Sequence, residues 1–376
     1  MILGLAHILL VITGLLKPNS KAVTWGIFLF TWVIIGLNTF TPDYATYKFV
    51  YEMVSEGMAL DEFEPLFTLL MFVCGKAGLP FQGFRMVYAG IYAILALATV
   101  RRLTNNRNVN AVLSLFMLWP LITNVSGIRF ALAAMVVCYF VPELIENKGK
   151  KGIVKFLIGI GIAFFIHMTS VFYLVLLFAR KRMTTFKQLG VYSVVVAAIL
   201  VLFSDIPRIV ISLLFSGATA QKLTKWLVLS SDMGYEHNSF LGFLAFSLFV
   251  IAFTVLVSMI SKRVIRAYRR DSECDNERLQ RITLYRNSSY CLLLIIPGFA
   301  IAGEYQRFLF GILPVYYSVF AGMHKYRLIG KRTRTLYSFL FVMLVLCEIG
   351  FYMYSNMVVS QNFNLLDVFE NNLLVK

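Results

Sequence analysis

The sequence predicts an all-α protein that crosses a membrane many times. Of its 376 residues, 59% are hydrophobic and only 14% are charged, and the mean hydropathy is +0.76. Apolar runs long enough to span a bilayer recur from one end to the other. The longest polar gaps, about 41–64, 205–238 and 262–281, are too short to form a separate hydrophobic core. We therefore predict a single transmembrane domain over residues 1–376.

The positive charges orient these spans. A net charge of +16 would suggest a nucleic-acid partner for a soluble protein. Here the lysines and arginines fall in short loops between apolar runs, which is typical of cytoplasmic loops. We predict no nucleic-acid partner and place the basic loops at about 262–281 and 324–334 in the cytoplasm. Four of the five cysteines lie in apolar runs without disulfide or metal-ligand spacing, which favours core positions.

The chain begins with two spans, Ile2–Leu16 and Ala22–Phe40, joined by a link that contains two lysines and no acid. The first span lacks the basic flank and the cleavage site of a signal peptide, so we expect it to be retained. The basic link belongs in the cytoplasm, which places the acidic segment 41–64 outside. Three tyrosines recur there at helical spacing and predict an aromatic face along the membrane surface: Tyr44, Tyr47 and Tyr51.

The next segment raises a conflict in the number of crossings. Pro65–Leu79 and Phe84–Val100 both resemble spans, yet the basic pair Arg101-Arg102 belongs in the cytoplasm, which requires an odd number of crossings. A re-entrant hairpin at 65–80, broken by two glycines and a proline, resolves the count. The alternative is a local failure of the positive-inside bias.

The later spans follow from the same rule: Ala111–Thr123, Phe130–Ile145, Leu189–Ser204, Phe240–Ile260, Thr283–Ala302, Phe308–Met323 and Thr335–Ser355. Residues 153–179 lie between two basic patches and must fold back on themselves, with the natural turn at His167–Ser170. The gap 205–238 is expected outside, with amphipathic helices. The total is about twelve spans plus the re-entrant piece, with both termini outside, and a GT-C-like arrangement is one option.

This orientation gathers the unusual polar residues on the outer side. Arg129 and Arg307 each begin an apolar helix, where the guanidinium fork and the helix N-terminus together favour a phosphate-like anion. A lipid-linked diphosphate is the natural ligand in a membrane. Snorkelling of Arg129 to a lipid head group is the simpler alternative. A transporter usually spreads ionisable groups through the midplane, but several spans here have almost none, which favours an enzyme that opens outward.

The candidate catalytic groups are one histidine and two acids. His167 interrupts an apolar run and is a candidate general base or a group that hydrogen-bonds the substrate; a packed histidine is the alternative. Asp43 and Glu64 are candidate acids in a segment where solvated acids are common. No motif for a nucleotide, a metal or a nucleophilic serine is present, so we predict no cofactor.

Three further residues are candidates for binding sugar. Tyr44 and Tyr47 are placed to stack on sugar rings, although an interfacial aromatic belt explains them equally well. Glu304 is either a sugar-binding residue or the salt partner of Arg307.

The order of these residues resembles that of the EpsG family of exopolysaccharide and capsule polymerases, over about residues 30–325. The resemblance rests on five short motifs: Asp43-Tyr44-x-x-Tyr47, Glu64-Pro65-Leu66-Phe67, Gly127-Ile128-Arg129-Phe130-Ala131-Leu132-Ala133, Phe165-Ile166-His167-Met168-Thr169-Ser170 and Glu304-x-x-Arg307. The family's arginine motif usually continues with glutamine, whereas Phe130 stands here.

The resemblance implies a Wzy-type polymerase of exopolysaccharide, capsule or O-antigen type, multi-pass in the bacterial cytoplasmic membrane. Such enzymes join oligosaccharide repeat units carried on polyprenyl diphosphate at the outer face, without nucleotide sugar or metal. Arg129 and Arg307 would hold the leaving diphosphate, and His167, Asp43 or Glu64 would deprotonate the acceptor hydroxyl. The substrate partners would be this lipid-linked oligosaccharide and the membrane lipid, with a chain-length regulator as a further candidate partner.

Two alternatives remain open from the residues alone. One is a GT-C-type glycosyltransferase that adds one sugar at a time from a lipid-linked donor, for which Asp43 would be essential. The other is a flippase or transporter of the same lipid-linked unit.

Overall fold

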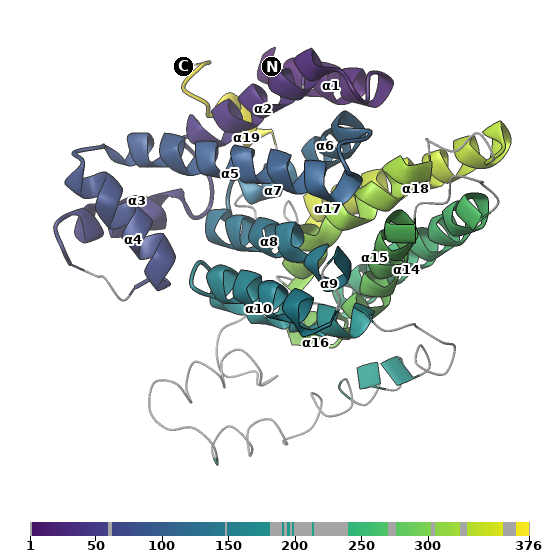
Figure 1. Cartoon of the computed structure of the whole chain (residues 1–376). Helices are drawn as coiled ribbons and strands as arrows, with labels where there is room; N and C mark the ends of the chain where they lie inside the picture. The colour runs from purple at the N-terminus through teal and green to yellow at the C-terminus, as the bar shows by residue number, and fades with distance from the viewer. Residues whose placement is uncertain are drawn as a thin grey trace.

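A computed structural model describes residues 2–58, 62–146, 149–180, 240–269, 276–301, 305–323, 329–355 and 366–375, with a few positions between 190 and 213. Over these ranges the chain is helical and contains no strand (Figure 1). An isolated bridge pairs Asn38 with Asn372, close to the C-terminus. The all-α class predicted from the periodic apolar runs is therefore confirmed.

The structure divides the chain into many helices of unequal length. In chain order they are α1 (Ile2–Leu16), α2 (Lys21–Gly36), α3 (Tyr44–Ser55), α4 (Pro65–Lys76), α5 (Phe81–Thr104), α6 (Val109–Leu118), α7 (Leu121–Asn124), α8 (Ile128–Phe140), α9 (Glu143–Glu146), α10 (Lys150–Phe164), the 3-10 helix η1 (Met168–Arg180), α14 (Phe240–Arg269), α15 (Asn276–Leu292), η3 (Leu293–Ile295), α16 (Gly298–Ile301), α17 (Gln306–Met323), α18 (Lys331–Ser355) and α19 (Asp367–Glu370).

Within the described residues, four helical segments are long and apolar enough to cross a bilayer: Phe81–Thr104, Ile128–Glu146, Gly242–Arg269 and Lys331–Tyr354. Several shorter apolar helices of 10–17 residues accompany them, including α1, α2 and α4. This pattern fits a membrane protein, because a helix of about 20 apolar residues matches the hydrocarbon thickness. The number of about twelve spans stays a prediction.

The helices define two opposite ends of the molecule. The first turns of α5 and α8 lie side by side at one end, where the Tyr88 hydroxyl donates to the Ile128 carbonyl at 2.7 Å. At the other end they finish together, where Arg102 donates to the Tyr139 carbonyl at 3.1 Å. We call these the Arg129 end and the Arg102 end. Figure 1 shows α3 and α4 beside the first and α9 near the second.

The α3–α4 pair lies in the segment where the count of crossings is in conflict. Arg85 lies near the start of α5 and donates to the Ile35 carbonyl, near the end of α2, over 2.9 Å. The end of α2 and the start of α5 are therefore neighbours, and the segment 37–80 between them starts and finishes at the same end of the molecule. The twelve residues of α4 cover about 18 Å, less than a bilayer. Gly78, with φ of 74°, reverses the chain before α5. Because α4 is one helix that continues through Gly75, the re-entrant hairpin expected at 65–80 stays a prediction.

The predicted fold-back near His167 is confirmed. Helix α10 ends at Phe164, and η1 begins at Met168 and runs back beside it (Figure 1). At its far end Arg180 donates to the carbonyls of Leu144 and Gly149, both at 2.9 Å. The basic flanks of this hairpin therefore lie together at the Arg102 end, and its turn lies at the Arg129 end.

Three sequence predictions of element bounds are wrong. The basic segment 262–269 is not a loop but continues α14, because its charged residues fall on the exposed face and Val264, Ile265 and Tyr268 fall on the buried face. Helix α18 likewise begins within the second predicted basic loop, at Lys331. The predicted span Thr283–Ala302 is interrupted at residues 293–297, where Pro297 cannot continue the α-helical hydrogen bonding. The gap 205–238 lies outside the described residues.

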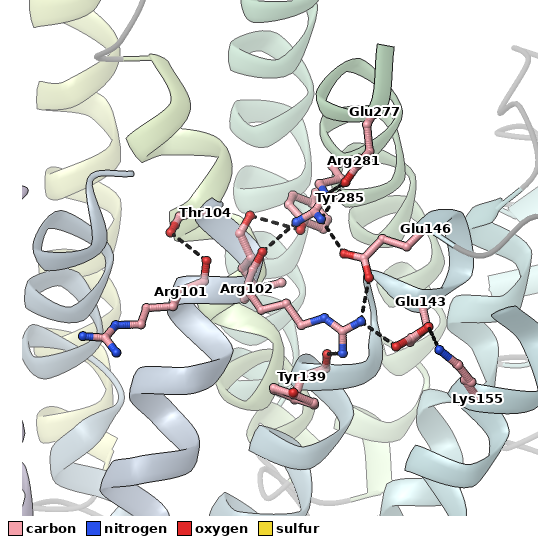
Figure 2. A network of polar contacts seen from close by, with 11 residues as sticks. Arg101, Arg102, Thr104, Tyr139, Glu143, Glu146, Lys155, Glu277, Arg281 and Tyr285 are labelled. Atoms are coloured by element: carbon pink, nitrogen blue, oxygen red, sulfur yellow. Dashed lines mark hydrogen bonds and ion pairs between the residues drawn. The ribbon is translucent and has the colours of Figure 1, made fainter. Parts of the chain in front are cut away.

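A network of ion pairs joins α5, α9, α10 and α15 at the Arg102 end (Figure 2). Arg102 contacts Glu143 at 2.5 Å and Glu146 at 2.6 Å. Arg281 contacts the same Glu146 and also Glu277, at 2.8 Å for the latter. Lys155 forms a further ion pair with Glu143, with 3.5 Å between Nζ and Oε2. Three positive and three negative groups are thus matched, and Arg281 is only 8% exposed.

We expect the ion pairs of this network to contribute unequally to the stability of the fold. Arg281→Ala should lower the free energy of unfolding by about 1.5–3 kcal/mol, the usual contribution of a hydrogen bond to a charged group, because Glu146 keeps Arg102 but loses its second cation. Lys155→Ala should cost less than about 1 kcal/mol, because the Lys155 side chain is 52% exposed and its ion pair is screened. Thermal unfolding of the purified variants in detergent compares them. Equal losses for the two variants would contradict this account.

Candidate functional site

Arg129 lies at the start of α8 and is held by protein groups. Its Nη1 contacts Glu64 Oε2 at 2.6 Å, and its Nε donates to the Tyr47 hydroxyl at 3.3 Å. The guanidinium stacks over the Phe63 ring, 3.9 Å from the centroid. The side chain is 21% exposed. Protein groups of α3, of the segment before α4 and of α8 therefore hold Arg129.

Glu64 joins Arg129 to the turn of the His167 hairpin. Its second carboxylate oxygen, Oε1, accepts from the Met168 backbone N–H at 2.9 Å. Two residues after Glu64, the Leu66 backbone N–H donates to the Phe165 carbonyl at 2.9 Å. Both oxygens of Glu64 therefore have donors, one of them a cation. Segments far apart in the sequence meet through this one carboxylate.

His167 is neutral and has a defined tautomer. Its Nδ1 lies 2.9 Å from the Thr169 hydroxyl and receives the Thr169 backbone N–H at 3.4 Å. A backbone N–H can only donate, so Nδ1 is the acceptor and the proton resides on Nε2. Burial lowers the pKa of His167 to about 4; Glu64 raises it, and Arg129 and Arg307 lower it further. Of the two roles considered, this geometry favours a hydrogen-bond donor over a general base.

Asp43 lies beside the loop that precedes Arg129. The Ser126 hydroxyl donates to Asp43 Oδ2 at 3.3 Å, and the residue immediately precedes α3. The carboxylate is half-buried. In contrast to Glu64, whose oxygen is held by a cation, Asp43 is contacted here by a neutral hydroxyl.

The predicted aromatic face of α3 is turned inward. Tyr47 and Tyr51 are only 5% and 3% exposed, and they pack against rings of the helices behind them. Lys48 and Glu52 form the exposed face instead. The prediction that these tyrosines lie along the membrane surface is wrong, because helix periodicity fixes which residues share a face but not which face packs inward.

Tyr44 and Tyr47 consequently have different surroundings. The buried Tyr47 ring lies 5.4 Å from Phe63 and its hydroxyl holds Arg129, so no ring face is open for a sugar. Burial raises the pKa of Tyr47, while the charges of Arg129 and Arg307 lower it. Tyr44 is half-buried and its hydroxyl donates to Gln82 Oε1 at 3.4 Å, away from Arg129.

Arg307 begins α17 at the same end as Arg129 and is exposed. Its charge is close enough to lower the pKa of both His167 and Tyr47. Phe308, the next residue, packs 5.7 Å from Phe130. The predicted partner Glu304 lies outside the described residues, so that pairing stays a prediction.

Phe130 occupies the position where glutamine was expected, and it has a packing role. Its ring meets the His167 imidazole edge to face at 5.7 Å, and on its other side meets Phe308 at the same centroid distance. The ring thereby spaces His167 from the start of α17 and keeps both elements beside α8. An amide at this position is not needed to connect the three elements.

Arg85 is a site residue that sequence reasoning missed. It is 1% exposed, its guanidinium lies over the Tyr44 ring at 5.3 Å, and its Nη2 donates to Ile35. Among the described residues, Nε and Nη1 have no hydrogen-bond partner. The available signal was an arginine inside an apolar run, the same rule that identifies Arg129.

Two arginines of the site act on the same neighbours. Arg129 is paired with Glu64, and both Arg129 and Arg307 lower the pKa of the neutral His167. Within the described ranges, no group of three histidines, cysteines or acids is arranged as metal ligands. The arrangement therefore suits an anion bound beside a neutral hydrogen-bond donor and a carboxylate.

The fold and the site define a class: a helical membrane protein with a polar, arginine-containing site at one end of its helices. The chain belongs to the EpsG family, whose model matches residues 23–366. No curated protein and no solved structure matches the chain. Family membership points to a polysaccharide polymerase, broadly a glycosyltransferase-type enzyme, with a lipid-linked oligosaccharide substrate in a membrane.

Proposed function

We propose that the protein joins oligosaccharide repeat units carried on polyprenyl diphosphate into a longer exopolysaccharide, capsule or O-antigen-type chain. The observation that carries this proposal is the Arg129–Glu64–Met168 connection, which holds an arginine fork beside the neutral His167 and near Arg307. A diphosphate is the membrane-bound anion that fits such a set, because guanidinium donors match phosphate oxygens.

Binding of the diphosphate exchanges the partner of Arg129. The incoming anion competes with Glu64 for the guanidinium, which is 21% exposed and so within reach. Once Arg129 turns to the phosphate oxygens, Glu64 keeps the Met168 N–H and gains a free oxygen. Arg307 binds the same diphosphate from the start of α17. The resting ion pair thus keeps Arg129 in position until the substrate arrives.

The transfer step breaks the bond between the anomeric carbon and the diphosphate oxygen of the donor. The acceptor hydroxyl forms a new bond to that carbon, and its proton passes to a carboxylate, Asp43 or the released Glu64, and then to solvent. The leaving diphosphate keeps the bonding electron pair, and the arginines stabilise its added charge. The Nε2 proton of His167 hydrogen-bonds a substrate oxygen.

We place the site on the outer face of the bacterial cytoplasmic membrane. The Arg102 end carries Arg101, Arg102, Lys150 and Arg180, which favours the cytoplasm under the positive-inside rule. The Arg129 end is therefore external. A chain-length regulator remains a candidate partner that acts from this outer side.

Two other functions are less well supported. A transporter must open both ends in turn, and opening the Arg102 end would separate the ion pairs of Figure 2. A GT-C-type glycosyltransferase would use the same groups but add one sugar at a time. The length of the product separates the second alternative from a polymerase.

Reconstitution of the purified protein in proteoliposomes with lipid-linked repeat units tests the proposal. We expect a ladder of products that differ by one whole repeat unit, together with release of polyprenyl diphosphate. In the producing strain, deletion of the gene should leave single units on the outer face of the membrane. Products that grow by one sugar would support the glycosyltransferase alternative, and single units retained on the inner face would support transport.

A further inference from the structure

A groove lined by aromatic and polar side chains lies beside the candidate site. It is a groove of about 620 Å³ between α3 and the turn that joins α4 to α5, within the usual range of about 300–1,000 Å³ for ligand pockets. Its wall includes Tyr44, Tyr51 and Phe81, and its rim includes Lys48, Glu52 and Gln82.

We infer that the groove binds the oligosaccharide portion of the lipid-linked substrate, an inference that rests on the proposed function. Aromatic rings next to an amide and a carboxylate are the combination that suits sugars, because rings cover the apolar C–H faces while planar polar groups hydrogen-bond neighbouring hydroxyls. The groove has this combination, with Tyr44 beside Gln82 and Glu52 along the rim.

The position of the groove connects it to the reaction site. Tyr44 follows the candidate acid Asp43 directly, and Tyr47, which holds Arg129, is one helical turn further along α3. The groove then continues along α3 as far as Glu56, and the whole helix of 12 residues is about 18 Å long. A sugar chain in the groove would therefore extend away from the candidate acid Asp43.

The Tyr44 ring is held as a rigid wall. The Arg85 guanidinium covers it at 5.3 Å, the Phe81 ring meets it at 5.2 Å in an edge-to-face contact, and its hydroxyl is bonded to Gln82. A fixed aromatic surface loses little entropy when a ligand binds. The rim is also charged rather than apolar, with Glu52 59% exposed and paired with Lys48. These features favour a sugar over an acyl chain.

A binding experiment tests this inference independently of catalysis. The probe is the repeat-unit oligosaccharide released from its lipid carrier by mild acid, and the measurement is saturation-transfer NMR and calorimetry with the protein in nanodiscs. We expect Glu52→Trp, which fills the groove, to weaken binding about tenfold or more. Thr46→Trp is the matched control, because Thr46 is exposed on α3 and does not line the groove; it should bind like the wild type.

Two further variants keep the outcome clear. Glu52→Ala removes only an exposed carboxylate, so folding is retained, and binding should fall about threefold or more. Arg129→Ala should slow the joining reaction by at least about 10²-fold but still bind the lipid-free probe. The inference is overturned if the wild type does not bind the probe, or if Glu52→Trp binds as well as Thr46→Trp. Binding without any joining by the wild type would instead remove the proposed function and leave the groove as a sugar site.

Discussion

Arg129→Ala is expected to reduce the joining of repeat units by at least about 10²–10³-fold, since charge stabilisation of this kind is usually the largest single contribution. The variant loses the fork that holds the diphosphate and leaves Glu64, 15% exposed, without its cation. Arg129→Lys should recover only part of the rate, because an ammonium cannot make the two parallel contacts of a guanidinium. The rate of joining in proteoliposomes and the polymer length in cells measure both variants.

The matched control is Arg101→Ala. Arg101 is exposed on α5 at the opposite end, and Figure 2 shows its side chain directed away from the ion-pair network. We expect normal polymer from this variant. Long polymer from Arg129→Ala, at a protein level equal to the wild type by immunoblot, would show that Arg129 does not hold the substrate.

A double variant separates the two roles of the Arg129–Glu64 pair. If Glu64 in the resting state mainly balances Arg129, the Arg129→Ala/Glu64→Ala variant should be more thermally stable than Arg129→Ala alone, because the unpaired carboxylate is removed. Its joining rate should be no better. If the double variant lost as much stability as the two single variants together, the two groups would act independently. That result would contradict an interaction through the 2.6 Å contact.

His167→Ala is expected to lower the joining rate by about 10²-fold, and His167→Gln by no more than about tenfold. The reason is the tautomer: Thr169 engages Nδ1, so His167 presents the Nε2 proton. A glutamine amide also donates a proton but is not a base. Single-turnover rates with the lipid-linked unit compare the variants. Equal and severe losses in both would support His167 as the general base instead.

The low pKa of His167 also predicts how stability depends on pH. The pKa is about 4 in the folded protein, below the usual 6.5, so the unfolded chain binds this proton more readily between these values. The stability contributed by neutral His167 is therefore present above about pH 6.5 and is lost as the pH falls toward 4. Unfolding temperatures measured from pH 7.5 to 4.5 should fall less steeply for His167→Gln than for the wild type. Parallel curves would contradict this.

Charge and hydropathy predicted a large part of this structure because they act segment by segment. The fold-back near His167 followed from two basic flanks that had to share one side. The same reasoning exposed the conflict in residues 65–100, where the chain between α2 and α5 leaves and returns at one end of the molecule. Element bounds failed where a helix continued past its apolar window, as in α14, because helical hydrogen bonding does not stop at the membrane surface.

What the sequence by itself determined was the membrane class, the family motifs and the set of residues that gather at one end. Only the tertiary structure decided which of them touch. Arg129 and Glu64 are 65 residues apart, and Glu64 and Met168 are 104 apart, so their contacts depend on how α3, α4, α8 and the hairpin pack. Packing also turned Tyr47 inward to hold Arg129 and left Tyr44 beside Arg85 in a groove. Helix periodicity specifies a face, but only the neighbouring helices determine what that face meets.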